Sequence, residues 1–199
     1  MTDFPLTNLT AIILAGGQSS RMGQDKTLLV FDGLPLLTRI CQAAQAIATP
    51  VYVITPWPER YQAIIPASCQ LLQETQPHQG PLIGFAQVLP QVKTEWVLLL
   101  ACDLPYLTPI TLQDWAVNLE KVDSDAIALL PLSDKGWEPL AGFYRISSFP
   151  LLQAYIAQGG QSFQGWLSLQ AVTELTIGDR SVLFNCNTVK DLEKLSKST

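Results

Sequence analysis

The chain has little of what several classes of protein need. It contains one histidine, His78, and four cysteines without C-x-x-C spacing, so the sequence gives no sign of a zinc site or a disulfide framework. Only 15% of the residues are charged and the net charge is −5, which argues against a basic face for nucleic acid or a membrane surface. No apolar run approaches the roughly 18 residues that span a bilayer. We expect a cytoplasmic protein whose cysteines are small core residues.

What the chain does have is a large apolar fraction, 48% of 199 residues, enough for the core of a single α/β domain spanning residues 1–199. Four nearly continuous apolar runs are typical of strands covered on both faces: 11–15, 51–55, 96–102 and 126–130. Apolar residues at helical spacing predict helices at 35–48, 58–64, 81–88, 109–122, 149–157 and 162–169. This alternation predicts a doubly wound, largely parallel sheet of the Rossmann-like α/β kind.

The end of the chain continues this pattern less clearly. Residues 174–187 are interpreted as late strand material. Thr188 and Asp191 then resemble a capping box, with Asp191 in the place of the usual Glu or Gln, which predicts a final helix to about residue 195.

The most informative segment is the glycine-rich loop at residues 14–26, directly after the first apolar run. Glycines let backbone N–H groups approach an anion, and Arg21 and Lys26 add two positive charges. The loop is no P-loop, because Gln24 and Asp25 separate Gly23 from Lys26, and it has no G-x-G-x-x-G spacing. A plain Gly-Ser surface turn has no reason to hold both cations. The loop therefore predicts a phosphate cradle for a nucleoside triphosphate.

A carboxylate follows the most hydrophobic strand of the chain. Asp103 comes directly after the run at 96–102, and Pro105 ends the strand. Ligands of such sheets bind beyond the carboxyl ends of the strands, so Asp103 lies at the expected ligand edge. A Mg²⁺ ion shared with triphosphate oxygens would satisfy a partly buried carboxylate there. The competing interpretation is an Asx turn before Pro105.

Five motifs in this order resemble those of the molybdenum cofactor guanylyltransferase family of nucleotidyltransferases. They are L-x-G-G-x-S-x-R-M-G-x-x-K at 14–26, G-P-L-x-G at 80–84, C-D-x-P-Y at 102–106, P-L-A-G at 139–142 and N-x-N-T at 185–188. The chain departs from the family in three places: Glu74 stands where an Asp that contacts the nucleotide is expected, residues 161–165 lack the usual basic side chains, and Phe184 directly precedes Asn185.

The resemblance implies roles for particular residues. Arg21, Lys26 and Asp103 are the expected catalytic residues, and Asp103 is the expected Mg²⁺ ligand. We expect the asparagine pair to lie on one face of an extended strand, close to the metal and the substrate phosphates. The expected nucleotide-binding residues are Leu14, Ala15, Gly16, Gly17, Ser19, Lys26, Glu74, Gly80, Pro81, Asp103, Asn185 and Asn187.

The resemblance also implies a reaction: transfer of GMP from GTP to the phosphate of Mo-molybdopterin, with release of pyrophosphate and formation of molybdopterin guanine dinucleotide. It implies transient contacts with molybdenum-insertion and acceptor enzymes. Two other functions stay open, a CTP-dependent molybdopterin cytidylyltransferase and a non-catalytic nucleotide-sensing domain. Relatives that use CTP generally have A-A-G where this chain has L-A-G-G, and acidic residues at the positions of Asn185 and Asn187. Intact Lys26 and Asp103 argue against a sensing domain.

Overall fold

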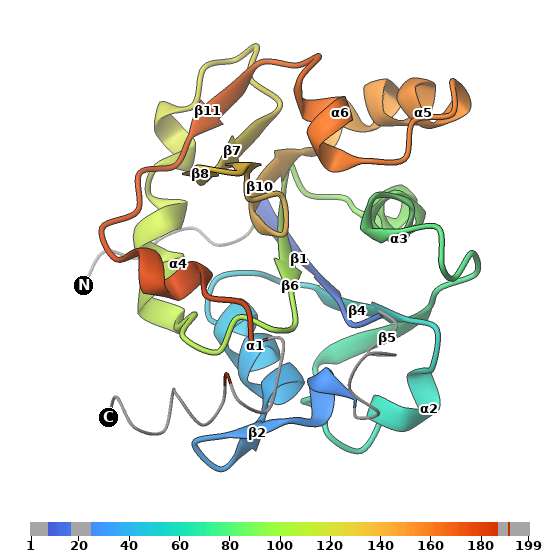
Figure 1. The fold of residues 1–199 in the computed structure, drawn as a ribbon, viewed down its shortest axis with the longest axis vertical. Coiled ribbons are helices and arrows are strands. Elements are labelled where there is room, and N and C mark those ends of the chain that lie inside the picture. Colours follow the sequence, from blue (N-terminus) through green and yellow to red (C-terminus); the bar gives the residue numbers. More distant parts are fainter. Residues whose placement is uncertain (1–7, 17–24, 187–190, 192–199) are drawn as a thin grey trace.

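The structure is a computed structural model that describes residues 8–16, 25–186 and 191. Its centre is a seven-stranded sheet in the order β11-β7-β10-β6-β1-β4-β5 (Figure 1). Among the described strands of this sheet, β10 alone runs antiparallel, between β6 and β7. The largely parallel α/β sheet predicted from the sequence is confirmed. The strands are β1 (Leu9–Leu14), β4 (Val51–Thr55), β5 (Cys69–Gln73), β6 (Trp96–Ala101), β7 (Ala128–Leu130), β10 (Ala141–Arg145) and β11 (Val172–Glu174).

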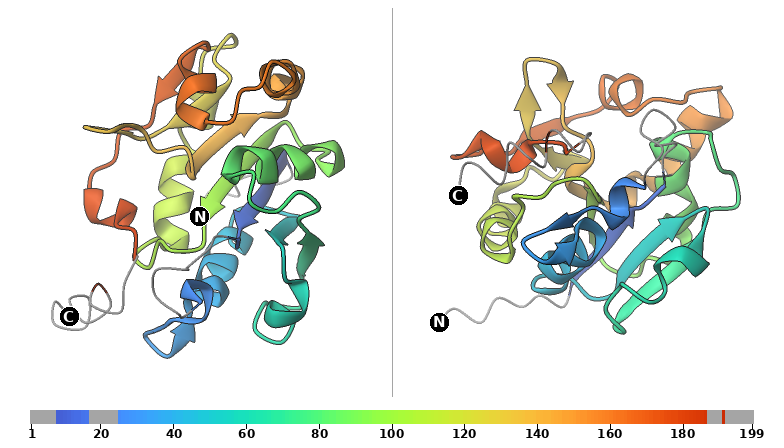
Figure 2. Two further views of the ribbon diagram at one scale, coloured as in Figure 1. Left: turned by 45° about the vertical axis from the view of Figure 1, so that its right-hand side comes forward. Right: turned by 60° about the horizontal axis from the view of Figure 1, so that its bottom comes forward.

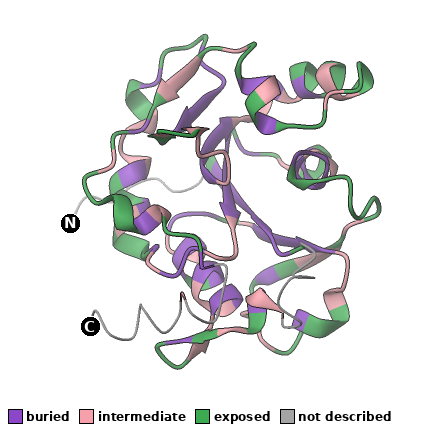
Figure 3. Ribbon diagram, viewed as in Figure 1, coloured by how far each residue is buried: buried purple, intermediate pink, exposed green. Residues whose placement is uncertain are grey.

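Helices cover both faces of this sheet (Figures 1 and 2). Neighbouring residues of a strand point to opposite faces, so Ile13 belongs to the core cluster that contains α1 and α4 residues, and Ile12 to the cluster that contains α3, α5 and α6 residues. The five inner strands are buried along most of their length, whereas the edge strands β5 and β11 are mostly half-buried or exposed (Figure 3). None of the described helices is long and apolar enough to cross a membrane. The helices are α1 (Leu36–Gln45), α2 (Pro58–Tyr61), α3 (Pro81–Val88), α4 (Pro109–Ala116), α5 (Phe149–Ala157) and α6 (Phe163–Leu167).

Short elements connect these layers. The hairpin of β2 (Val30–Phe31) and β3 (Leu34–Pro35) turns at Asp32 and Gly33, whose φ angles are +50° and +78°. Positive φ at both central residues gives the turn twist that suits a two-residue hairpin. A second hairpin joins β8 (Leu132–Ser133) to β9 (Gly136–Trp137). The 3-10 helices are η2 (Lys26–Leu28), η3 (Leu89–Gln91), η4 (Leu119–Lys121), η5 (Ile146–Ser148) and η6 (Arg180–Leu183).

One predicted element is wrong. The strand expected at 174–187 ends at Glu174, and η6 follows it. Asp179 explains the change, because its carboxylate accepts hydrogen bonds from the N–H and the hydroxyl of Ser181, at 2.8 and 2.7 Å. Such local side-chain bonds give the backbone an alternative to strand pairing. The final helix expected from Thr188 lies outside the described residues, apart from Asp191.

The parallel strands bring four loops to one edge of the sheet. Leu14 at the end of β1 pairs with Ile54 in β4 and with Ala101 at the end of β6, and Thr55 at the end of β4 pairs with Gln73 in β5. The segments that follow these strands therefore start side by side. They carry most of the residues that the sequence marks as candidates for binding.

Candidate active site

A cleft at this edge consists of two adjoining hollows that share Leu14, Gly16 and Pro81. The β5-side hollow has a volume of about 300 Å³ and the β6-side hollow about 270 Å³. The β5-side hollow is completed by Ile54, Pro56, Trp57, Glu74, His78, Gly80 and Gly84. The β6-side hollow is completed by Ala15, Asp25, Lys26, Thr27, Tyr61, Ala101, Cys102, Asp103, Leu140 and Asn185.

Lys26 and Asp103 face each other in the β6-side hollow. Lys26 is the first residue of η2, and Asp103 follows the end of β6. Lys26 Nζ lies 3.9 Å from Asp103 Oδ2, and the two side chains are 26% and 18% exposed. Lys26 and the residue that follows β6 therefore meet at one point, as the sequence predicted.

The described residues leave one oxygen of the Asp103 carboxylate without a hydrogen bond. Its Oδ1 atom is buried and has no hydrogen-bond partner among the described residues. Burial raises the pKa of Asp103, although Lys26 and a backbone hydrogen bond act in the opposite direction. An ionised carboxylate with one unsatisfied, buried oxygen fits a hard divalent cation such as Mg²⁺, which prefers oxygen ligands.

In a second carboxylate of the same hollow, that of Asp25, both oxygens accept hydrogen bonds. Asp25 Oδ1 accepts hydrogen bonds from Thr27 N and Thr27 Oγ1, at 3.0 and 2.6 Å, and Oδ2 accepts one from the Tyr61 hydroxyl, at 2.5 Å. Sequence reasoning assigned no role to Asp25 or Tyr61. An Asp before a short helical turn is a recognisable cap, but its bond to Tyr61 joins residues far apart in the chain.

Glu74 lies between two glycines in the β5-side hollow. A Cβ atom at Gly16 would lie 3.1 Å from Glu74 Oε2 and 2.8 Å from Pro56 Cδ, and one at Gly84 would lie 3.4 Å from Glu74 Oε1. Any side chain at position 16 would therefore collide with Pro56, so this position requires a glycine. Burial raises the pKa of Glu74, and the nearby His78 lowers it. Glu74 directly follows β5, so its side chain lies at the carboxyl edge of the sheet.

Gly80 shapes the entrance to α3. Its φ of +90° and ψ of 168° lie in a region that is essentially restricted to glycine. Beyond its two chain neighbours, no described residue has an atom within 4 Å of a Cβ atom built on Gly80, so the backbone conformation requires the glycine. Pro81 then occupies the first position of α3 and lines both hollows.

Asn185 reaches the site in a different way from the one predicted. It lies in irregular chain after η6, and not in a strand. The next residue holds the segment in place, because the Cys186 N–H donates to the Asp103 carbonyl oxygen at 2.9 Å. Cys186 is buried against Phe31 and Leu36. This backbone bond carries Asn185 to the wall of the β6-side hollow.

The outcome for the predicted site residues divides into three sets. Leu14, Ala15, Gly16, Lys26, Pro81, Asp103 and Asn185 line the β6-side hollow. Glu74 and Gly80 line the adjoining β5-side hollow. Gly17, Ser19, Arg21 and Asn187 lie outside the described residues.

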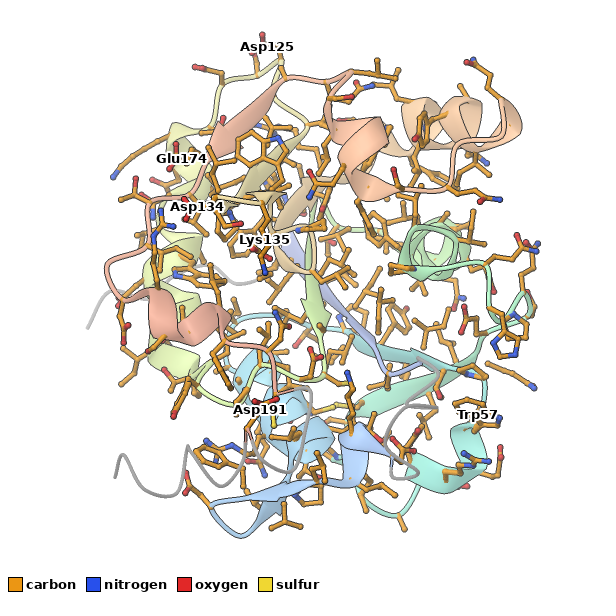
Figure 4. All side chains as sticks on the ribbon, in the orientation of Figure 1. Trp57, Asp125, Asp134, Lys135, Glu174 and Asp191 are labelled. Atoms are coloured by element: carbon orange, nitrogen blue, oxygen red, sulfur yellow. The ribbon has the colours of Figure 1, made fainter. Side chains whose placement is uncertain are left out.

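Several lining residues were missed by sequence reasoning. Pro56 and Trp57 follow β4, so the rule that ligands bind beyond strand ends could have found them. Trp57 lies beside α2 (Figure 4), with the guanidinium carbon of Arg60 4.5 Å from its ring centroid. Leu140 belongs to the P-L-A-G motif at 139–142, but no binding role was assigned to it. Tyr61 gave no comparable signal, because α2 lies far from the motifs in the sequence.

The cysteines match their predicted structural role with one exception. All four are free thiols, and Cys41, Cys69 and Cys186 are buried. Cys102 lines the β6-side hollow beside Asp103, which the sequence did not predict. Burial and the neighbouring Asp103 charge raise the pKa of the Cys102 thiol, which keeps it protonated and unreactive.

Comparison with known proteins places this cleft in a class. A family model described as "MobA-like NTP transferase domain" matches residues 11–172. The matched segment contains most strands of the sheet, and it includes both Lys26 and Asp103. The fold and the match together define the protein as a nucleotidyltransferase.

Individual relatives narrow the class. The chain is 57% identical over 187 residues to the probable molybdenum cofactor guanylyltransferase of Trichormus variabilis, with 94% of this chain and 90% of the relative covered. It therefore belongs to the molybdenum cofactor guanylyltransferase family.

Two solved structures share the fold. Molybdopterin-guanine dinucleotide biosynthesis protein A from Archaeoglobus fulgidus superposes with a TM-score of 0.76 at 21% identity, over 96% of this chain and 100% of its own. Rv0371c from Mycobacterium tuberculosis, in complex with manganese, gives a TM-score of 0.70 at 16% identity, over 96% and 100%.

Proposed function

We propose that the protein transfers GMP from GTP to the phosphate of Mo-molybdopterin, releasing pyrophosphate and forming molybdopterin guanine dinucleotide. Membership of the guanylyltransferase family supports this reaction. The observation that carries it is the 3.9 Å approach of Lys26 Nζ to Asp103 Oδ2 inside a cleft at the carboxyl edge of the sheet. A cation and a carboxylate in that position suit a triphosphate with its metal ion.

The two hollows suggest how GTP is divided between them. The β5-side hollow, with Glu74, Gly80 and Pro81, takes the guanosine part. Leu14 and Gly16 line both hollows, and Ala15 lines the β6-side hollow next to them. The β6-side hollow takes the triphosphate, which meets Lys26 directly. The loop residues Gly17, Ser19 and Arg21 are proposed to complete the phosphate cradle.

Asp103 is the proposed Mg²⁺ ligand, with Asn185 and Asn187 next to it. The buried, unpartnered Oδ1 of Asp103 supports this assignment. When bound, Mg²⁺ would neutralise triphosphate oxygens and the charge that develops on pyrophosphate. Lys26 and Arg21 would add positive charge to the same groups.

The acceptor itself supplies the nucleophile. A phosphate monoester has a second pKa near ~6, so its oxygen is already largely ionised at neutral pH and needs no general base. That oxygen attacks the α-phosphorus of GTP while the bond to the bridging oxygen breaks, and pyrophosphate leaves with the electron pair. The protein's task is to align the two anions and to offset their repulsion.

We also propose that residues 1–199 act as one nucleotidyltransferase domain. The single seven-stranded sheet, which draws strands from Leu9 to Glu174, supports this organisation. Contacts with molybdenum-insertion and acceptor enzymes stay a prediction.

The test is incubation with Mo-molybdopterin, Mg²⁺ and each labelled nucleoside triphosphate, with the product identified by mass. GTP is expected to give the guanine dinucleotide and pyrophosphate, and CTP is expected to give nothing. A cytosine dinucleotide would identify a cytidylyltransferase instead. GTP binding without any product would identify a nucleotide-sensing domain.

A further inference from the structure

The Asp25 carboxylate connects two distant parts of the chain. Its Oδ1 atom caps η2 through Thr27 N and Thr27 Oγ1, at 3.0 and 2.6 Å. Its Oδ2 atom accepts the Tyr61 hydroxyl at 2.5 Å. Three donors thus satisfy one carboxylate and join the start of η2 to α2.

Tyr61 is well suited to act as a fixed donor. It is the last residue of α2 and is 1% exposed, packed in the cluster that contains α1 and β4 residues. Burial and the hydrogen bond to Asp25 raise its pKa, so the hydroxyl keeps its proton. A buried, protonated phenol on a short helix holds its acceptor in one place.

The position of Asp25 matters because Lys26 follows it directly. Both residues line the β6-side hollow, and Lys26 Nζ lies 3.9 Å from Asp103 Oδ2. The two carboxylates of this hollow differ: Asp25 has donors on both oxygens, whereas Asp103 Oδ1 has no partner among the described residues. An Asp25 that lost a donor would become available to pair with the neighbouring Lys26, in competition with a bound anion.

We propose that Tyr61 is a positioning residue that acts through Asp25 to keep Lys26 directed at Asp103 and at the triphosphate. The inference rests on the proposed binding of GTP in the β6-side hollow. It assigns Tyr61 no contact with substrate.

The test is a double-mutant cycle on GTP affinity, measured by calorimetry with Mg²⁺ for the wild-type protein, Tyr61→Phe, Lys26→Ala and the double variant. We expect Lys26→Ala to weaken GTP binding by about 10- to 100-fold, because it removes a charged contact. Tyr61→Phe is expected to weaken it by about 5-fold, and by less than about 2-fold when Lys26 is already absent. Equal factors in both backgrounds, or no effect of Tyr61→Phe at all, would overturn the inference.

A matched control separates positioning from stability. Thr94→Val removes a buried hydroxyl that bonds to Thr10 Oγ1 and the Trp96 carbonyl at the start of β6, at 2.8 and 2.9 Å. It should lower Tm in a similar way and leave GTP affinity unchanged; a loss of affinity as large as that of Tyr61→Phe would count against positioning.

Two further results keep the inference and the proposed function distinguishable. If Tyr61→Phe does not fold, Asp25→Asn takes its place in the cycle, since it keeps the cap on Thr27 and removes the charged acceptor of Tyr61. If Lys26→Ala binds GTP like the wild-type protein, the triphosphate assignment itself fails. If Lys26→Ala is weakened and Tyr61→Phe is not, only the positioning inference fails.

Discussion

The two hollows of the cleft differ in how they are built. The β6-side hollow is defined by charge, since Asp25, Lys26 and Asp103 all line it. The β5-side hollow is defined by backbone shape, with Gly16 in contact with Glu74 and Gly80 in a glycine-only conformation. One side is thus suited to a polyanion with its metal, and the other to a flat, largely uncharged group. The β6-side hollow should respond to changes of charge, and the β5-side hollow to a single added methyl group.

The largest effect is expected on the charged side. Asp103→Ala should lower the rate of GMP transfer by about 10³-fold or more, because metal stabilisation of the transition state is worth several kcal/mol. The measurement is pyrophosphate release with GTP and Mo-molybdopterin, together with a Tm that shows the variant is folded. Unchanged turnover in a folded variant would reject the assignment of Asp103 to the metal.

Lys26→Ala should have the next largest effect and should act on the phosphate part of GTP. We expect the Kd for GTP to rise by about 10- to 100-fold and the Kd for guanosine to stay the same, because the lost contact is a charge-assisted one. Lys121→Ala in η4, which removes the same charge away from both hollows, is the control. Equal losses for GTP and guanosine would contradict the division of the cleft.

Gly80→Ala tests the side built from backbone shape. The substitution forces a side chain into a conformation with φ of +90° and ψ of 168°, which costs about 1–3 kcal/mol. The expected result is a lower free energy of unfolding in urea and weaker guanosine binding, with no change in the dependence of GTP affinity on Mg²⁺. Wild-type stability in Gly80→Ala would show that the entrance to α3 has another conformation open to it.

The smallest effect is a gain in stability from neutralising the buried carboxylate. Burial places the folded pKa of Asp103 above its ordinary value of 3.8, so the folded state binds its proton more tightly than the unfolded state. The free energy of unfolding of the wild-type protein therefore falls as pH rises through the folded pKa of Asp103. Asp103→Asn has no carboxylate at this position and does not show this loss. At neutral pH the variant should therefore be more stable than the wild-type protein and unfold at a higher Tm.

The difference in stability between Asp103→Asn and the wild-type protein should disappear well below pH 3.8, where Asp103 is protonated in both the folded and the unfolded state. Thermal unfolding of the metal-free protein at several pH values provides the measurement. A variant less stable than the wild-type protein at neutral pH would mean that the Lys26 pair outweighs the cost of burial.

Much of the fold followed from local patterns. The bounds predicted for α3 and α5 agree with the structure, because each has a proline in its first turn. Strand β10 was not predicted, although its pairing with β6 and β7 closes the gap between two parallel parts of the sheet. The position of β10 in the sheet depends on partner strands that are distant in sequence, and hydrophobic periodicity does not reveal such pairings.

The site shows the same division. The convergence of Lys26 and Asp103 was predictable, since both follow strands that end at one edge of the sheet. The bond between Tyr61 and Asp25 was not, because it joins α2 to the N-cap residue of η2, 36 positions away in the chain. The bond from Cys186 to the Asp103 carbonyl likewise replaces the strand that was expected to present Asn185.

The central claim is that Asp103 binds a divalent ion, and that this ion and Lys26 together bind the triphosphate. Calorimetric titration of GTP into the wild-type protein and Asp103→Asn, each with and without Mg²⁺, tests it most directly. Mg²⁺ should strengthen GTP binding to the wild-type protein and should have little effect on the variant. The same Mg²⁺-dependent gain in both proteins would contradict the account.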